Sequence, residues 1–401
     1  MTSLLILGAA DGALSAYRAA AEMGYRTIAV DRSATAPGVA LADEYLPLST
    51  RDADGILAAL DGRTDLAGVL APASDAAVPT LRTLTAALGL PGQMSDLAAR
   101  ASVDKWVLRG ILDELGVSSY PWIMASDPAE LAERAATLRF PVFVKPADAQ
   151  SGRGVTRCTT PSEVLDAAVV ARERSYSGVI MVEEEIPGVL YNCECIVDGG
   201  RVALAAISRQ ALCPPPLVLT VRRDMPAGLP LDVEDTTRSV IEKVCARLGY
   251  QRGPLNLDLI VTPDGEPYII ELGLRTGGNG TDDMVRLCYG VDPTRAAVLA
   301  AVDRPIELTP HPPRPVRWQV LASERAGDLV GIWGEASTRA LPDVFRLEVL
   351  ARPGRPVHPY QDVSDRLGWF VVHADTAPAL DAAADLVART LRFEVSTRAD
   401  G

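Results

Sequence analysis

The chain has 401 residues, a formal net charge of −13 and a sequence pI near 4.8. This acidic balance argues against a nucleic-acid partner and against a basic surface that docks on membranes. No apolar run approaches the ~20 residues that cross a bilayer. The length predicts two or three domains, and six scattered cysteines predict reduced thiols in a cytoplasmic protein.

The first hundred residues predict a Rossmann-like domain. A strand, a helix and a second strand form a βαβ opening, which favours a parallel sheet. The loop from Gly8 to Gly12 has the spacing G-x-x-x-G, which does not fit the G-x-G-x-x-G of dinucleotide-binding turns. The predicted strands are 3–10, 26–31 and 66–72, and the predicted helices are 12–25 and one from residue 75.

The pattern changes after residue 104 and again near a proline-rich linker at 308–315. Between these points we predict helices and strands that alternate, and after them strands with one long helix, a small α+β module. The predicted helices are 104–115, one from 161 and 235–250, and the predicted strands are 141–146, 178–186, 191–199, 255–261 and 267–272.

Lys145 stands out because the chain has only three lysines among its 39 basic residues. It ends an apolar strand, and a loop with Gly152 and Gly154 follows, whose successive amides can form a concave site for anions. Lysine is the usual point charge against nucleotide phosphates. The pattern predicts a phosphate site, and the alternative is an ordinary turn with a surface lysine.

Asp258 and Glu271 interrupt apolar runs on two predicted antiparallel strands around a tight turn. Two carboxylates brought together in this way suit Mg²⁺, which takes hard oxygen ligands together with substrate phosphates. Arg275 follows four residues after Glu271, where a guanidinium can steady developing negative charge. The alternative is a pair of carboxylates on the exposed face of an amphipathic hairpin.

The order and spacing of these motifs resemble the ATP-grasp carboxylate–amine ligases, the superfamily of biotin carboxylase, D-alanine–D-alanine ligase and the L-amino acid ligases. The resemblance covers about residues 1–305, with a match also in the tail. It implies an ATP-grasp fold of the α/β and α+β class. The implied domains are a Rossmann-like pre-ATP-grasp domain at 1–104, an ATP-grasp domain at 105–307 with a lid at about 117–182, and a C-terminal α+β module at 308–401.

The resemblance also implies roles for individual residues. Arg275 is expected to be catalytic, and Asp258 and Glu271 are expected to hold two Mg²⁺ ions, with Mn²⁺ as an alternative. The family usually has Asn where this chain has Gly273, so a water or Asn279 would supply that metal ligand. The expected ATP-binding residues are Lys105, Lys145, Ser151, Gly152, Gly154, Glu183, Glu184, Ile186 and, for the ribose, Glu194.

The sequence indicates the substrate-binding residues less clearly than the nucleotide-binding residues. Asp75 is a candidate for meeting an incoming amine. Arg209, Arg222 and Arg223 flank a proline-rich insert that is a candidate for capping the pocket, with a solvated loop as the alternative for these arginines. Three further candidates for binding a substrate carboxylate are Gly277, Gly278 and Asn279.

The predicted reaction joins an amino acid or similar carboxylate to an amine through an acyl phosphate, with release of ADP and phosphate. The alternatives are an ATP-dependent carboxylase that uses bicarbonate, and a nucleotide-binding protein without turnover. Small molecules are the expected partners, and the resemblance leads us to expect a homodimer.

Overall fold

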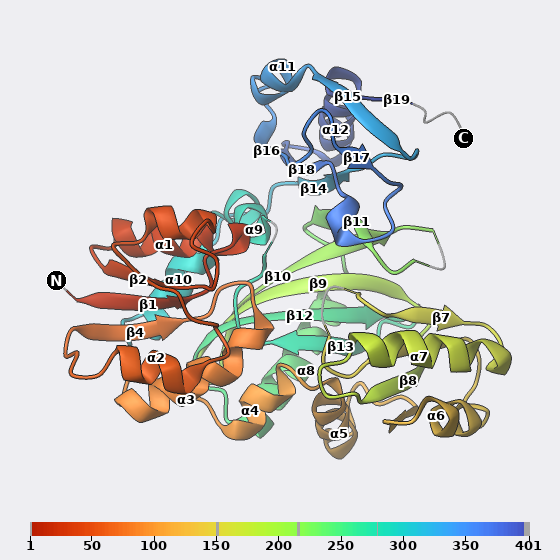
Figure 1. The fold of residues 1–401 in the computed structure, drawn as a ribbon, viewed down its shortest axis with the longest axis horizontal. Coiled ribbons are helices and arrows are strands. Elements are labelled where there is room, and N and C mark those ends of the chain that lie inside the picture. Colours follow the sequence, from red (N-terminus) through yellow and green to blue (C-terminus); the bar gives the residue numbers. More distant parts are fainter. Residues whose placement is uncertain (1, 150–151, 215–216, 279, 397–401) are drawn as a thin grey trace.

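The computed structural model describes residues 2–149, 152–214, 217–278 and 280–396. Two of the predicted site residues, Ser151 and Asn279, lie outside these ranges. The described residues form four β-sheets with helices packed on them (Figure 1), which confirms the predicted α/β and α+β class. None of their helices is both long and apolar enough to cross a membrane.

The N-terminal sheet is parallel, as the βαβ pattern predicts, with the strand order β3-β2-β1-β4. Helices cover both of its faces, so β1 is buried from end to end. One of these helices, α10, comes from far along the chain and packs on α1 and β4. The elements are β1 (Ser3–Leu7), β2 (Arg26–Val30), β3 (Glu44–Leu46), β4 (Leu66–Leu70), α1 (Leu14–Glu22), α2 (Ala53–Ala59), α3 (Val78–Leu88), α4 (Asp96–Ala101) and α10 (Pro293–Ala301).

A smaller antiparallel sheet, in the order β5-β8-β6-β7, lies on the opposite side of the molecule and carries α6 and α7 (Figure 1). Asp127 begins α6 by accepting from the amides of Ala129 and Glu130, and Pro128 occupies the first helical turn. The elements are β5 (Trp122–Ala125), β6 (Val142–Pro146), β7 (Thr156–Cys158), β8 (Ile180–Glu184), α6 (Pro128–Ala135) and α7 (Val164–Arg174).

The largest sheet has eight strands in the order β13-β12-β9-β10-β11-β14-β18-β16. Its core lies under α5 and α8, each of which ends at a glycine in the left-handed conformation, Gly116 and Gly249. The strands are β9 (Val189–Asp198), β10 (Arg201–Leu212), β11 (Thr220–Met225), β12 (Gly253–Val261), β13 (Pro267–Gly273), β14 (Val316–Leu321), β16 (Val344–Val349) and β18 (Gly368–His373), and the helices are α5 (Lys105–Leu115), α8 (Leu231–Leu248) and α9 (Thr281–Tyr289).

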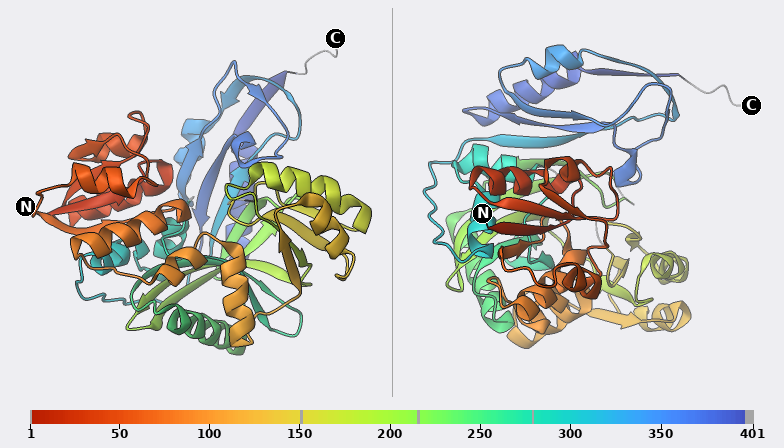
Figure 2. Two further views of the ribbon diagram at one scale, coloured as in Figure 1. Left: turned by 60° about the horizontal axis from the view of Figure 1, so that its bottom comes forward. Right: turned by 60° about the vertical axis from the view of Figure 1, so that its left-hand side comes forward.

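The C-terminal residues do not form a sheet entirely of their own, because β14, β18 and β16 continue the large sheet beyond β11. A separate three-stranded sheet and two helices complete this lobe, which lies at the top of the right-hand view of Figure 2. Its elements are β15 (Gly327–Trp333), β17 (Pro356–Val357), β19 (Arg392–Ser396), α11 (Glu335–Arg339) and α12 (Ala377–Thr390). Short 3-10 helices lie at Asp11–Ala13, Pro37–Leu41, Asp75–Ala77, Pro161–Glu163 and Val363–Asp365.

Candidate active site

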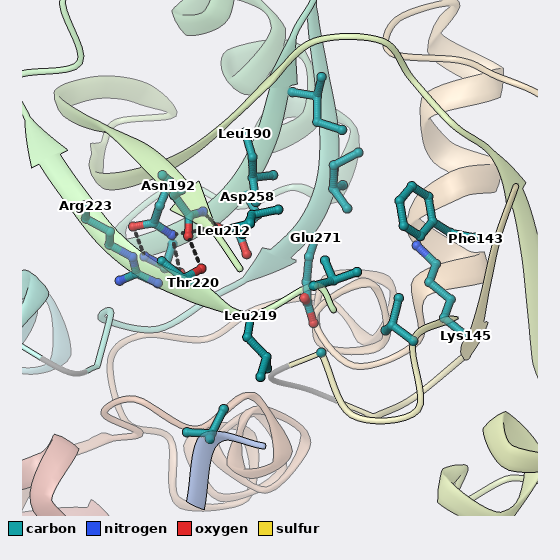
Figure 3. Close-up of a pocket in the computed structure, with 18 of the residues that line it drawn as sticks. Phe143, Lys145, Leu190, Asn192, Leu212, Leu219, Thr220, Arg223, Asp258 and Glu271 are labelled. Atoms are coloured by element: carbon teal, nitrogen blue, oxygen red, sulfur yellow. Dashed lines mark hydrogen bonds between the residues drawn. The ribbon is translucent and has the colours of Figure 1, made fainter. Parts of the chain in front are cut away.

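A cavity of about 620 Å³ lies between the small antiparallel sheet and the eight-stranded sheet. Lys145 and Glu183 line one end, which we call the β6 end, and Arg223 and Trp318 line the other, which we call the β11 end. Figure 3 shows Glu271 and Asp258 between these ends. The lining combines residues from the N-terminal domain (Ala73 and Asp75, after β4), from both sheets of the middle region and from the C-terminal lobe.

The predicted metal carboxylates lie on adjacent strands. Asp258 on β12 is the direct cross-strand partner of Glu271 on β13, and Asn192 on β9 is its partner on the other side. Partners in register point to the same face of a sheet. Nδ2 of Asn192 donates to Oδ1 of Asp258 over 3.0 Å, and Nε2 of Gln210 donates to the same oxygen over 2.9 Å. Burial raises the pKa of Asp258.

Lys105 begins α5 and reaches Glu271 across the cavity. Its Nζ donates to Oε1 of Glu271 over 3.1 Å and to the carbonyl of Ala149 over 2.5 Å. Burial acts to raise the pKa of Glu271, but the charge and hydrogen bond of Lys105, together with the charges of Arg275 and Lys145, hold the pKa below its usual value. The carboxylate is therefore ionised and already faces a cation.

Glu183 is the centre of a buried charge cluster at the β6 end. It forms an ion pair with Lys145, accepts from Nε of Arg109 over 2.9 Å, and accepts from the hydroxyl of Tyr120 over 3.2 Å. Burial acts to raise the pKa of Glu183, but Lys145 and Arg109 outweigh it and lower the pKa to about 2. Burial lowers the pKa of Lys145 to about 8, and the charge of Arg109 acts in the same direction.

This cluster has one carboxylate for two cations, so it retains a positive charge that faces the cavity. The side chain of Glu183, expected to serve the hinge that reads adenine, is committed to Lys145 and Arg109. Glu184 and Ile186, which follow Glu183, also line the cavity, as does Gly152. Gly154 does not appear in the lining, and its φ of 72° marks a tight turn in the loop.

Arg275 and Asp75 form a two-pronged ion pair between segments 200 residues apart. Nε and Nη2 of Arg275 each donate to one oxygen of Asp75 over 2.8 Å. Asp75, which we expected to meet an amine, is therefore held by the residue expected to be catalytic, and both line the cavity.

This ion pair explains why residue 273 is glycine. A Cβ atom on Gly273 would lie 1.9 Å from Oδ1 of Asp75 and 3.1 Å from Nε of Arg275. Contacts below 3 Å are not tolerated without a shift. The carboxylate of Asp75 thus occupies the place where a side chain at position 273 would begin.

Like Gly154, two further expected binding residues do not line the cavity. Glu194 is 1% exposed and accepts from the amide of Gly277 and from Nδ2 of Asn256, and burial raises its pKa to about 7. It shapes the Gly277–Gly278 turn from behind, and these two glycines do line the cavity. Arg209 is exposed, because the alternation of β10 turns Gln210 inward instead. Both expectations need this correction.

The sequence reasoning missed several residues of the site. Asn192 and Gln210 sit in apolar strands, where an unexplained amide is a usable signal. Arg109 lies four residues after Lys105 on the same helix face, a spacing that points to a shared site. Strands β10 and β11 were also missed, because the prolines and arginines between residues 209 and 226 predict an insert.

The donor set fits Mg²⁺ rather than a transition metal. Among the described residues, no three His, Cys, Asp or Glu side chains cluster as metal ligands. Asp258 and Glu271 offer carboxylate oxygens side by side, and Mg²⁺ is commonly bound by one or two carboxylates together with substrate phosphates. Both carboxylates lie in the same cavity as Lys105 and Lys145.

Two family profiles match the chain. The ATP-grasp domain matches residues 138–283, and the L-amino acid ligase C-terminal domain 2 matches residues 319–396. An uncharacterized protein y4rH of Sinorhizobium fredii is 26% identical over 84% of this chain and 70% of its own length. A D-alanine–D-alanine ligase of Methylococcus capsulatus is 27% identical over 59% of this chain and 73% of its own length.

The fold is that of solved ATP-grasp ligases. The crystal structure of an L-amino acid ligase from Bacillus licheniformis superimposes with a TM-score of 0.84 and 20% identity, and it covers 99% of each chain. The chain thus contains an ATP-grasp domain, followed by the C-terminal domain 2 of the L-amino acid ligases.

Proposed function

We propose that the chain joins the carboxylate of an amino acid, or of a similar acid, to an amine at the expense of ATP. The observation that carries this proposal is one cavity that holds Lys105, Lys145, Asp258, Glu271 and Arg275, drawn from distant parts of the chain. Little acid–base chemistry is needed for such a reaction, and no histidine is found in the described lining. The ATP-grasp and L-amino acid ligase matches support the same reaction class.

In this proposal the triphosphate of ATP lies along Lys145 and Lys105, with the base toward Glu184 and Ile186. Asp258 and Glu271 would hold Mg²⁺, with Mn²⁺ as a substitute, and such an ion would neutralise phosphate charge when bound. The excess positive charge around Glu183 favours the phosphates before any ligand binds.

The substrate carboxylate oxygen attacks the γ-phosphorus, the bond to the ADP oxygen breaks, and an acyl phosphate forms. The amine nitrogen then attacks the acyl carbon, phosphate leaves, and the amine loses a proton. Arg275 steadies the negative charge at this centre, and Asp75 fixes the orientation of its guanidinium. The loop that contains Gly152 limits entry of water, which would hydrolyse the acyl phosphate.

The alternative of a protein without turnover arose because the family usually has Asn where this chain has Gly273. The position of Asp75 beside this glycine weakens that alternative. The position is glycine because Asp75 fills the space beside it. The six cysteines are free thiols, which supports our placement of the protein in the cytoplasm. A homodimer remains the expectation from the family.

The test is ADP release from Mg²⁺-ATP with L-amino acids, singly and in pairs, and separately with bicarbonate. We expect release that requires an amino acid and produces an amide, and that fails in Lys145→Ala. Release driven by bicarbonate alone would instead establish a carboxylase. ATP binding without ADP release in any mixture would establish a protein without turnover.

A further inference from the structure

Four polar side chains lie together on one face of β9 and β12, and we call them the polar cluster. Asn192 and Glu194 on β9 are the cross-strand partners of Asp258 and Asn256 on β12. Residues two apart on a strand point to the same face, and the side chains between them face the apolar core under α8. Asn192, Glu194 and Asn256 are buried, so their polar groups need partners within the protein.

Two amide side chains form the centre of the polar cluster. Nδ2 of Asn192 donates to Oδ1 of Asn256 over 3.2 Å, and Nδ2 of Asn256 donates to Oδ1 of Asn192 over 3.3 Å. Asn256 also donates to Glu194 over 2.8 Å, and Asn192 donates to Asp258 over 3.0 Å. Because an ionised carboxylate only accepts, each amide nitrogen has to face its carboxylate, which fixes the orientation of both amides. The result is a continuous chain of hydrogen bonds from Glu194 to Asp258.

The two ends of this chain belong to different parts of the site. At one end, Asp258 is a candidate metal carboxylate that lines the cavity, and Figure 3 shows it beside Asn192. At the other end, both oxygens of Glu194 accept from the amide of Gly277, over 3.0 and 2.9 Å. A Cβ atom on Gly277 would lie 2.7 Å from Oε2 of Glu194, so glycine is what lets the turn come this close. Gly277 and Gly278 line the cavity, whereas Glu194 does not.

We propose that the polar cluster is a positioning device, which holds the Gly277–Gly278 turn at a fixed place relative to Asp258. The inference rests on the proposed function, since it takes Asp258 as a metal ligand and the turn as part of the substrate site. In that reaction the substrate oxygen has to line up with the γ-phosphorus, and a misplacement of about 1 Å can cost on the order of 100-fold in rate. A hydrogen-bonded link between the metal side and the substrate side keeps the two reacting groups aligned.

Gln210 provides a matched control for this link. Its Nε2 donates to Oδ1 of Asp258 over 2.9 Å, and this is the same oxygen that Asn192 contacts. Its side-chain oxygen accepts from Thr220 on β11. In the part of the chain that the structure describes, no hydrogen bond joins Gln210 to either asparagine or to Glu194. Asn192 and Gln210 therefore both orient the metal carboxylate, but only Asn192 connects it to the turn.

The test measures the affinity of the full chain for ADP with and without Mn²⁺ by calorimetry, because the ratio of the two dissociation constants gives the contribution of the metal. We would compare wild type with Glu194→Gln, and repeat the comparison in the Asn192→Ala and Gln210→Ala backgrounds. Glu194→Gln keeps the size of the side chain but places an amide NH₂ against other donors, so it breaks the chain at the end far from the metal. Burial raises the pKa of Glu194 to about 7, so the measurement is made at pH 8.

We expect Glu194→Gln to reduce the gain in affinity from Mn²⁺ by roughly three- to tenfold, as for other groups that orient metal ligands indirectly. The reduction should persist in the Gln210→Ala background and vanish in the Asn192→Ala background, where the link is already cut. Asn256→Ala cuts the link at its centre, so it should give the same pattern and serves if Glu194→Gln does not fold.

Three outcomes would overturn the inference. The two backgrounds could behave alike, which would mean that the charge of Glu194 acts through space and not through the asparagines. Glu194→Gln could leave the gain from Mn²⁺ unchanged, or Mn²⁺ could give no gain in wild type.

Kinetics adds a second measurement where an amino-acid pair supports ADP release. At saturating Mg²⁺, Glu194→Gln should lower kcat by roughly 10- to 100-fold and leave the KM for ATP unchanged. A purely structural role would lower the free energy of unfolding without this split between kcat and KM, and an unchanged kcat would contradict the inference. If no mixture releases ADP, the proposed function fails, whereas the ADP affinities still decide whether the polar cluster links the turn to the metal site.

Discussion

At the β6 end of the cavity, Lys145 and Arg109 share the single carboxylate of Glu183, whereas at the β11 end Arg223 has an alcohol and an indole as neighbours. The first arrangement fixes cations in place before any ligand binds, because each is hydrogen-bonded and buried. In the second, the part of the chain that the structure describes provides no carboxylate within ion-pair distance of Arg223. A charge that is paired within the protein fixes the geometry of the site. A charge without such a partner indicates the charge of the ligand that the site binds.

The largest expected effect comes from removing one cation of the paired end. Arg109→Leu leaves Glu183 with Lys145 alone and leaves the carbonyls of Ile269 and Ile270 without their donor. Breaking a buried ion pair costs about 3–5 kcal/mol, so we expect the free energy of unfolding in urea to fall by that amount. Arg247→Leu removes an exposed pair with Glu114 and should change little. Similar losses in both variants would contradict the paired cluster.

The Asp75–Arg275 pair lies between the two ends and is tested through Gly273. A methyl group in Gly273→Ala would displace the carboxylate of Asp75 and turn Arg275 out of position. Since misplacement by about 1 Å can cost on the order of 100-fold in rate, we expect such a fall in kcat with ATP affinity unchanged. Adding Gly273→Ala to Asp75→Ala should cost nothing further, and additive losses would show that the two residues act separately.

A substitution of Lys145 tests whether the phosphates of ATP bind at the β6 end of the cavity. Lys145→Ala should weaken ATP binding by roughly 10- to 100-fold, because a hydrogen bond to a charged group contributes ~1.5–3 kcal/mol. Lys243→Ala is the control, since Lys243 is exposed on α8. Calorimetric titration with ATP measures the affinity of both variants. Equal affinities would show that the phosphates do not bind beside β6.

The smallest effect is a dependence on pH that distinguishes the two ends. The pKa of Lys145 is lowered to about 8 by burial, and only its charged form attracts phosphate. ATP affinity should therefore be nearly full at pH 7 and fall as the pH rises through 8, by roughly three- to tenfold between pH 7 and pH 9. Lys145→Arg stays charged over this range and should remove the dependence, whatever its affinity at pH 7. A slope retained in that variant would assign the titration to another group.

Much of the site was predictable because its motifs are local. A strand that ends in Lys145 and runs into a glycine loop needs only short-range patterns, and so does the hairpin that brings Asp258 opposite Glu271. The resemblance to ATP-grasp ligases rests on these same segments, and the domain matches at 138–283 and 319–396 confirm it. The βαβ opening likewise predicted a parallel sheet from its periodicity.

The sequence by itself thus indicated the phosphate, metal and acyl groups of the site, because each of these motifs is confined to a short stretch of consecutive residues. Only the tertiary structure decided which side chains and strands pair with one another. Asp75 meets Arg275 across 200 positions, Arg109 meets Glu183 across 74, and β11 pairs with β14 across some ninety. Such contacts follow from packing and sheet register, not from local propensity. For the same reason, the sequence suggested that a metal ligand had been lost at Gly273. In the folded chain, the carboxylate of Asp75 occupies the space that a side chain at this position would need.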